Sequence, residues 1–259
     1  MAYAPESQEE RDFLEHYDAD RYRHPSVTAD ILAFTAHGTD LRILLVKRGG
    51  YPYKGRYAIP GGFVRIDESA EEAAQRELLE ETGIKGITMH QLATYSAVDR
   101  DPRTRVISIA YIAMVPETAL ADAHGGDDAT DAKTFSILRH GNGFILVGDD
   151  NEIVTEDRLA FDHARMIDDA INRMVGRLDY TDDAFELLPD ESDFTISELR
   201  QVFEAISGQH YEASNFHRTF MQRYVDTGKV VVTGDVSHRD GNEPYRGRPA
   251  TTYAIVHND

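Results

Sequence analysis

Residues 62–84 read GFVRIDESAEEAAQRELLEETGI, and this stretch decides the fold of the chain. It matches the pattern G-x5-E-x7-R-E-U-x-E-E-x-G-U, in which U is an aliphatic residue. Ser69 followed by Glu72 is typical of a capping box, which predicts a helix that begins near Ala70. Gly83 is the expected end of this helix, because glycine adopts the left-handed conformation at low cost. The small apolar residues between these ends form one stripe that is expected to face a sheet: Ala70, Ala73, Ala74 and Leu78.

Three glutamates of the predicted helix share one face. Glu77, Glu80 and Glu81 are spaced i, i+3 and i+4. Two such charges about 4 Å apart repel by roughly 4 kcal/mol at an effective dielectric constant near 20, so a cleft tolerates them only with a divalent cation among them. Carboxylate oxygens suit Mg²⁺ or Mn²⁺, and Mg²⁺ commonly binds phosphate oxygens as well. The pattern therefore predicts a metal-bridged phosphate site. The alternative is a glutamate-rich surface helix exposed to solvent.

The same stretch resembles the Nudix box at every fixed position. The resemblance implies an α/β fold, the Nudix α/β/α sandwich, in which the box forms a loop and a helix. It implies hydrolysis of a nucleoside diphosphate linked to a further group. It also implies that Glu77, Glu80 and Glu81 are catalytic and hold Mg²⁺ or Mn²⁺, with the carbonyl of Gly62 as a further ligand. Within the catalytic box, Glu68 and Arg76 are implied to form an ion pair that fixes the loop against the helix.

Composition limits the class of protein. The chain has 259 residues, of which 41% are hydrophobic, and no cysteine, so thiolate metal sites and a cysteine nucleophile are excluded. No apolar run reaches the length of a membrane span and no signal peptide is apparent, so we expect a cytoplasmic protein without membrane contact. The net charge of −19 argues against nucleic acid. From Phe194 to the end, however, seven Lys and Arg residues face eight Asp and Glu residues, so this part could contact DNA.

Periodicity divides the chain into four parts. Residues 1–24 are a polar N-terminal extension with a short helix, and residues 25–180 form the domain that contains the box. Strands are predicted at 27–36, 42–47, 87–97 and 105–115, and a hairpin at 135–138 and 143–147. A helix at 159–180 is expected to cover the other face of the sheet; His163 lies in it and is assigned no chemistry. Residues 181–193 are acidic and are predicted to be a linker, and residues 194–259 form a second domain.

Two loops of the first domain carry candidate substrate-binding residues. Arg100 and Arg103, in the charged loop 99–103, could bind phosphate or ribose, or could belong to a solvated turn. Asp127 and Asp128 lie in an acidic loop after a strand. The general base could be one of the box glutamates or one of these loop acids, and the sequence leaves both open.

The second domain has the order of a winged helix-turn-helix. A helix at 197–206 is followed by Gly208, by a second helix predicted to be capped by Ser214, and by a hairpin at 230–232 and 251–256. The second helix of such a domain enters the major groove, which makes Asn215, His217 and Arg218 candidate DNA-binding residues. The loop of the hairpin supplies further candidates: Arg239, Arg246 and Arg248. The alternative is a winged helix used only for dimerisation.

Further motifs narrow the resemblance. They are YRHPSVTAD at 22–30, PGGFV at 60–64, DPR at 101–103, GDDA at 126–129, LAFDH at 159–163 and GRPA at 247–250. Together they are similar to ADP-ribose-type Nudix proteins, and especially to the Nudix-related transcriptional regulators of NAD metabolism (NrtR). That resemblance implies a homodimer that senses ADP-ribose and binds a palindromic DNA operator. Many such regulators carry a degraded box, whereas this chain keeps its glutamates, so hydrolysis of ADP-ribose to AMP and ribose 5-phosphate stays open.

Two alternatives remain. One is a dedicated ADP-ribose pyrophosphatase whose C-terminal domain only dimerises. The other is a Nudix enzyme for a different nucleotide, because the box is shared by all of them.

Overall fold

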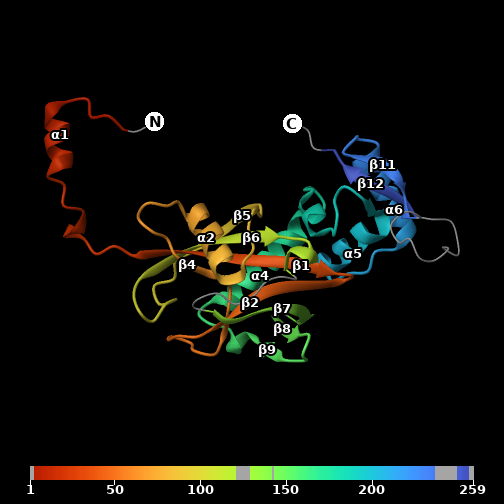
Figure 1. Cartoon of the computed structure of the whole chain (residues 1–259), viewed down its shortest axis with the longest axis horizontal. Helices are drawn as coiled ribbons and strands as arrows, with labels where there is room; N and C mark the ends of the chain where they lie inside the picture. The colour runs from red at the N-terminus through yellow and green to blue at the C-terminus, as the bar shows by residue number, and fades with distance from the viewer. Residues whose placement is uncertain (1–2, 121–128, 142, 237–249, 257–259) are drawn as a thin grey trace.

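A large mixed sheet with helices on both faces forms most of the molecule, and a small three-stranded sheet with two helices forms its C-terminal part (Figure 1). The computed structural model describes residues 3–120, 129–141, 143–236 and 250–256. The strands of the large sheet are β1 (Ser26–His37), β2 (Asp40–Arg48), β3 (Tyr57–Ala58), β4 (Gly61–Phe63), β5 (Met89–Tyr95), β6 (Val106–Met114), β7 (Ala129–His140), β8 (Gly143–Gly148) and β9 (Ile153–Thr155).

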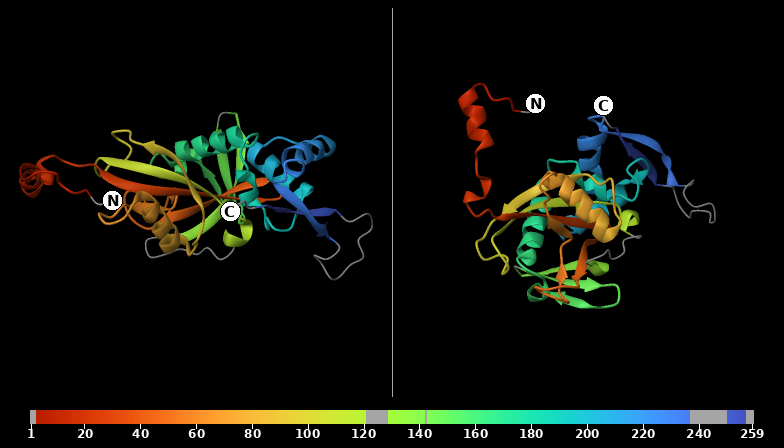
Figure 2. Two further views of the ribbon diagram at one scale, coloured as in Figure 1. Left: turned by 90° about the horizontal axis from the view of Figure 1, so that it is seen from above. Right: turned by 60° about the vertical axis from the view of Figure 1, so that its left-hand side comes forward.

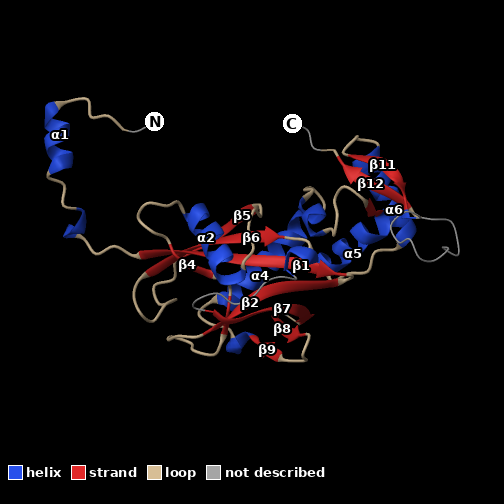
Figure 3. Ribbon diagram, in the orientation of Figure 1, coloured by secondary structure: helices blue, strands red, loops and turns tan. Residues whose placement is uncertain are grey.

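The remaining elements are mostly helical (Figure 3). The α-helices of the described part are α1 (Gln8–Glu15), α2 (Ala70–Thr82), α3 (Glu117–Leu120), α4 (His163–Arg177), α5 (Ile196–Ser207) and α6 (Ala213–Phe220). Short helical turns are η1 (Ala19–Arg21), η2 (Glu156–Arg158), η3 (Asp183–Leu187) and η4 (Met221–Val225). The strands of the small sheet are β10 (Phe194–Thr195), β11 (Val230–Asp235) and β12 (Thr251–Ile255).

The strand order explains why the large sheet is buried at its centre. The order is β5-β6-β1-β2-β7-β8-β9, with β3 paired to β2 and β4 paired to β1. β1 runs parallel to β6 and antiparallel to β2. Successive side chains of β1 point to opposite faces: Leu32 and Phe34 join the core on the α4 side, whereas Ile31 and Ala33 join the core under α2. Helices therefore cover both faces, as the α/β/α prediction required (Figure 2).

Both ends of α2 lie where the sequence predicted them. Ser69 accepts a hydrogen bond from the N–H of Glu72, whose side chain bonds back to the N–H of Ser69, so the capping box is present. Gly83 ends the helix with φ of 78°, in the left-handed region. The predicted apolar stripe is buried at Ala73, Ala74 and Leu78.

The predicted helix at 159–180 is shorter than expected. α4 begins at His163, because the preceding residues bond to the sheet instead: the N–H of Ala160 donates to the carbonyl of Tyr57 at 2.8 Å. The other predicted strands and helices of the first domain are present, with ends shifted by one to three residues, and β7 begins six residues earlier than predicted. No helix of the described residues is long and apolar enough to cross a membrane.

Residues 181–193 do not form a free linker. They include η3, in which Ala184, Phe185 and Leu187 are buried. The ring of Phe185 packs against Phe194 at 5.5 Å and against Tyr224 at 4.9 Å between centroids. The segment is rich in acidic residues, so its few apolar side chains were not predicted to be buried. The domain limits themselves stay predictions.

One hydrophobic cluster runs from the large sheet into the C-terminal helices. It contains residues of β1 and α4 together with residues of α5, α6 and β12. Polar bonds support the same junction: Arg139 of β7 donates to the carbonyls of Ile206 and Ser207, and Arg223 of η4 donates to the carbonyl of Leu178 at 2.7 Å. The C-terminal domain is therefore packed against the large sheet rather than tethered to it.

The C-terminal domain has the predicted helix, turn, helix and hairpin. Its second helix corrects one expectation: the N-cap is Glu212 and not Ser214. The carboxylate of Glu212 accepts from the N–H of Asn215 at 2.8 Å and from the hydroxyl of Ser214 at 2.6 Å. An acid satisfies the helix N-terminus here, which is favourable because that end carries positive charge.

The N-terminal extension stands away from the body of the protein (Figure 1). α1 is capped by Ser7 and contains no buried residue. Phe13 and Tyr17 contact each other at 5.7 Å between ring centroids and remain exposed.

Candidate functional site

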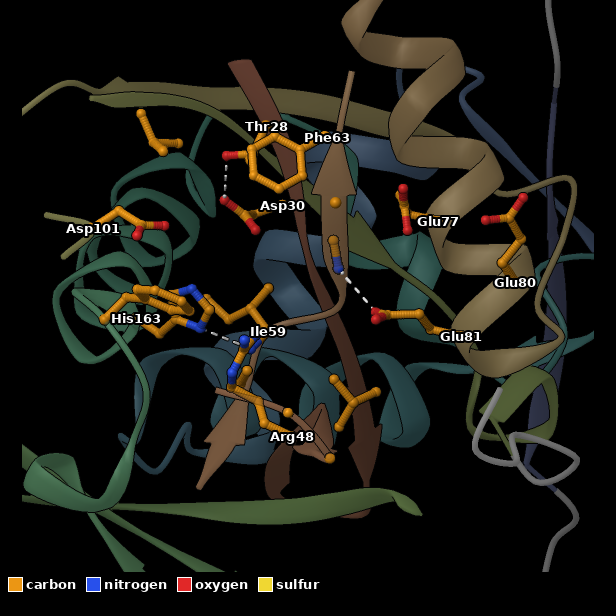
Figure 4. Close-up of a pocket in the computed structure, with 18 of the residues that line it drawn as sticks. Thr28, Asp30, Arg48, Ile59, Phe63, Glu77, Glu80, Glu81, Asp101 and His163 are labelled. Carbon is orange, nitrogen blue, oxygen red and sulfur yellow. Dashed lines mark hydrogen bonds between the residues drawn. The ribbon is translucent and has the colours of Figure 1, made fainter. Parts of the chain in front are cut away.

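A cavity of about 580 Å³ opens beside α2 (Figure 4). It is lined by residues of β1 and β4, by the loop after β2, by the loop 100–103 and by the residues at the start of α4. Four of the lining residues belong to α2: Arg76, Glu77, Glu80 and Glu81. The box and the arginine loop, which are separate in sequence, therefore meet at one cavity.

Arg76 holds the loop of the box against its helix. Its Nη2 donates to Oε1 of Glu68 at 2.6 Å, and its Nε donates to Oε2 of Glu68 at 3.0 Å. Nη2 also donates to the carbonyl of Phe63 at 3.1 Å. These bonds from Arg76 lower the pKa of Glu68 to about 2. The ion pair that the sequence implied is present in the structure.

The same arginine lies among the candidate metal ligands. Its Nη1 is 2.5 Å from Oε1 of Glu77 and 3.1 Å from Oε2 of Glu80. Glu81 points elsewhere and accepts from the N–H of Gly61 at 3.0 Å (Figure 4). Burial raises the pKa of Glu81 to about 7. Repulsion among the three carboxylates is thus offset by one guanidinium and one backbone amide.

Two glycines let β4 lie close to its neighbours, Gly62 close to α2 and Gly61 close to β1. A Cβ atom on Gly62 would collide with the carboxylate of Glu77. A Cβ atom on Gly61 would collide with the backbone of β1 at Ala29 and Asp30. The backbone of the box therefore forms one wall of the space that the glutamates occupy. A ligand role for the Gly62 carbonyl stays a prediction.

The donor set suits a hard divalent cation. Glu77, Glu80 and Glu81 supply only carboxylate oxygens, the preferred donors of Mg²⁺ and Mn²⁺. Among the described residues no three His, Cys, Asp or Glu side chains already converge on one metal position. Glu77 and Glu80 are bonded to Arg76 instead. A cation in this site would therefore have to compete with Arg76 for two of its ligands.

Asp30 is a site residue that the sequence did not single out. It is buried on β1, accepts from the hydroxyls of Ser108 and Thr28, and lines the cavity. Burial raises its pKa to about 6. The available signal was an acid inside an otherwise apolar strand, which is costly unless the group is hydrogen-bonded.

Aromatic rings and arginines also line the cavity. The guanidinium of Arg103 lies 5.4 Å from the ring centre of Phe63 and 5.7 Å from that of Phe161. Arg48 lies 4.9 Å from the ring centre of Phe161. The sequence did not identify three of these site residues: Arg48, Phe63 and Phe161. Only the folded chain brings β2, β4 and the start of α4 together.

The two predicted loop arginines differ in their surroundings. Arg100 is 8% exposed and binds both oxygens of Asp162, at 2.7 and 3.0 Å. Arg103 pairs with Asp101 at 2.7 Å, yet 41% of its side chain is exposed at the cavity. Of the two arginines, Arg103 is therefore the more accessible to a ligand in the cavity. The predicted loop acids, Asp127 and Asp128, lie outside the described residues.

His163 is a buried residue that also lines the cavity. Its Nδ1 accepts from the N–H of Ile59 at 2.9 Å (Figure 4). Burial lowers its pKa to about 3, so the imidazole is neutral at physiological pH. This bond fixes the start of α4 against the segment between β3 and β4.

The predicted DNA-binding residues of α6 lie on the surface. Asn215, His217 and Arg218 are exposed, whereas Phe216 and Phe220 face the core. Arg218 donates to the side-chain oxygen of Asn215 at 3.2 Å. The remaining candidates, Arg239, Arg246 and Arg248, lie outside the described residues.

Comparison with known proteins agrees with both parts of this architecture. The NUDIX domain matches residues 24–139, and the NrtR DNA-binding winged helix domain matches residues 184–255. The ADP-ribose pyrophosphatase of Methanocaldococcus jannaschii is 40% identical over 148 residues, which cover 57% of this chain and 74% of that protein. The chain belongs to the Nudix family. Its box is the Nudix box, and α2 is the Nudix helix.

This Nudix protein is also similar to regulators over nearly its whole length. The ADPR responsive transcriptional repressor NtrR of Acinetobacter baylyi is 29% identical over 252 residues, covering 96% of this chain and 90% of the repressor. The crystal structure of Shewanella oneidensis NrtR complexed with a 27mer DNA superposes with a TM-score of 0.63 at 26% identity, over 89% of this chain and 93% of that one. The predicted fold, a Nudix domain followed by an NrtR-type winged helix, is confirmed.

Proposed function

We propose that this Nudix protein is an ADP-ribose-responsive DNA-binding regulator that also hydrolyses ADP-ribose to AMP and ribose 5-phosphate with Mg²⁺ or Mn²⁺. The observation that carries the proposal is a complete box facing a cavity, in one chain with an NrtR-type winged helix. Similarity to a repressor described as ADPR responsive supports the regulatory part. Identity of 40% with an ADP-ribose pyrophosphatase supports the enzymatic part.

The chain's own residues divide the work of binding and positioning. Glu77, Glu80 and Glu81 would hold the cation, which when bound would neutralise diphosphate charge and activate a water molecule. The ion pair between Arg76 and Glu68 holds the loop of the box against its helix. The partly exposed guanidinium of Arg103 would suit diphosphate oxygens, which such a group binds through paired N–H donors.

DNA binding is assigned to the exposed face of α6. Asn215, His217 and Arg218 are exposed on this helix, and Asn and Arg are the side chains that most readily bind base edges. We propose a homodimer whose two α6 helices bind the two halves of a palindromic operator, because two-fold symmetry in the protein matches two-fold symmetry in the site.

The first experiment measures AMP release from ADP-ribose by the full chain with Mg²⁺ or Mn²⁺. Glu80→Gln serves as the matched variant, because it removes one ligand charge and keeps the shape of the side chain. Metal-dependent turnover that Glu80→Gln abolishes is the expected result. Saturable binding without turnover would remove the hydrolytic part and leave a sensor, and absence of both would overturn the proposal.

A second candidate is a dedicated ADP-ribose pyrophosphatase whose C-terminal domain only dimerises. One observation favours it: the cap of α6 is Glu212, and hydrogen bonds from Ser214 lower the pKa of Glu212 to about 2, so a full negative charge lies beside the predicted DNA-binding residues. Salt-sensitive binding to a specific DNA fragment would eliminate this candidate.

A further inference from the structure

A second cavity, of about 270 Å³, lies where the large sheet meets the C-terminal helices. Its walls come from β5 and β6, from the C-terminal half of α4, from the segment after α4 and from α5. It shares no lining residue with the cavity at the Nudix box. The cavity is therefore a separate site, and its walls belong to both halves of the chain.

The interior of this second cavity is apolar. Ile112, Met174, Leu178 and Ile206 line it and are each at most 5% exposed. Protein interiors are normally close-packed, so these side chains would otherwise contact each other. A hollow with such walls favours an occupant with an apolar body, because burial removes apolar surface from water.

Basic side chains line the mouth of the cavity: His90, Arg173 and Arg177. Arg177 pairs with Asp183, which also lines the cavity, at 2.7 Å, and His90 lies 3.4 Å from Glu186. Arg173 donates one hydrogen bond, to the carbonyl of Leu92 at 3.3 Å, and forms no ion pair with a carboxylate of the described residues. Arg173 is exposed at the edge of the apolar hollow, so its guanidinium is available to the carboxylate of a bound ligand.

We infer that this cavity binds a small organic acid with a compact apolar body and one carboxylate, which pairs with Arg173. A guanidinium matches a carboxylate because two parallel N–H groups meet two oxygens. The volume lies below the roughly 300–1,000 Å³ of sites for larger ligands, so the apolar body is about one ring in size. A nucleoside diphosphate does not fit this description, which separates the site from the function proposed above.

The test uses phenylacetate as the probe and methionine methyl groups as reporters. The chain has six methionines, of which Met89, Met114 and Met174 line the second cavity. Met166 is the reference, because it does not line the second cavity and its sulfur is 3.7 Å from Nη2 of Arg100, a residue that lines the Nudix cavity. In methyl NMR spectra of the full chain, phenylacetate is expected to shift the three lining methyl signals saturably and to leave Met166 unchanged.

Two comparisons isolate the carboxylate contact. Arg173→Gln is expected to weaken phenylacetate binding by about tenfold or more, since a hydrogen bond to a charged group is worth roughly 1.5–3 kcal/mol. Arg165→Gln is the matched control, because Arg165 lies on the same helix, pairs with Asp169 at 3.7 Å and does not line the cavity. Phenylacetamide, which keeps the ring and lacks the charge, is expected to bind about tenfold more weakly as well.

Four outcomes would overturn the inference. The three lining methyl signals could stay unchanged at about 10 mM phenylacetate, a concentration that saturates sites of millimolar affinity. Only Met166 could respond, which would place the acid in the Nudix cavity. Binding could be equal for Arg173→Gln or for phenylacetamide, which would leave a purely apolar pocket. Finally, the same signals could move on dilution of the protein alone, which would mean that a second copy of the chain fills the cavity.

Discussion

The guanidinium of Arg76 binds both carboxylate oxygens of Glu68, at 2.6 and 3.0 Å, and thereby joins the loop of the Nudix box to its helix. The same group contacts Glu77 and Glu80. Arg76 therefore positions two candidate metal ligands while it fixes the loop. Arg76 donates five hydrogen bonds in all, because its guanidinium also reaches the carbonyl of Phe63. An ammonium group would replace these bonds poorly, because it has only three N–H groups and no planar fork.

The first prediction concerns the planar guanidinium group of Arg76. Arg76→Lys keeps the charge and loses the paired geometry, so we expect the rate of ADP-ribose hydrolysis to fall roughly 10- to 100-fold, as small misplacements of catalytic groups cause. Arg165→Lys, on the exposed face of α4, is the control and should keep the wild-type rate. An unchanged rate in Arg76→Lys would show that the positive charge alone suffices.

The second prediction concerns the closeness of β4 and α2. Gly62→Ala places a methyl group where the carboxylate of Glu77 lies, so we expect hydrolysis and metal binding to be lost. Gly176→Ala is the matched control, because a Cβ atom there meets nothing within 4 Å in helix α4. That control should keep activity and gain about 0.5–1 kcal/mol of stability. Metal titration followed by calorimetry separates the two variants.

The third prediction concerns the pH dependence of stability. The pKa of His163 is about 3 in the folded protein and about 6.5 in the unfolded chain. Below pH 6.5 only the unfolded chain takes up the proton, so the contribution of His163 to stability falls as the pH drops from 6.5 towards 3. His163→Asn keeps an acceptor for the N–H of Ile59 and removes the titration. Between pH 7.5 and 5, wild type should lose about 2 kcal/mol more than this variant in urea unfolding. Equal losses would mean that His163 is protonated in the fold.

The fourth prediction concerns the segment between the two domains. Phe185→Ala should cost about 3–5 kcal/mol, because the ring is buried against Phe194 and Tyr224. Tyr180→Ala is the control: this ring is 71% exposed and should change stability by less than about 0.5 kcal/mol. A loss below about 1 kcal/mol in Phe185→Ala would restore the view of this segment as a free linker.

The fifth prediction concerns α6. Arg218→Ala should weaken operator binding and lower the salt dependence of the binding constant by about one ion, if Arg218 contacts a phosphate. A uniform effect on all DNA sequences would assign Arg218 to phosphate, and a relaxed sequence preference would assign it to a base. Unchanged binding would remove Arg218 from the interface. Lys85→Ala, at an exposed position three residues after the end of the Nudix helix, is the charge-matched control.

The Nudix helix could be predicted from local sequence signals. Much of the cavity could not, because it depends on packing between distant parts of the chain. Ser69, Glu72 and Gly83 act within their own helix, so their spacing alone located both of its ends. Asp30 and Phe161 come from elements 131 residues apart, and only strand pairing and the packing of α4 bring them to one cavity. The cap at Glu212 was missed for another reason: serine is the commoner cap, and the choice between neighbouring candidates depends on the path of the preceding turn.

The hydrophobic cluster that continues from β1 and α4 into α5, α6 and β12 has a consequence for how the protein comes apart. Two units recognisable separately in sequence share one interior, so heat should melt them in a single cooperative transition rather than in two. Cutting the chain near residue 190 would leave each fragment with an uncovered apolar surface. The winged helix is thus expected to be less soluble when expressed alone, and heating is expected to disrupt the box cavity and the surface of α6 together.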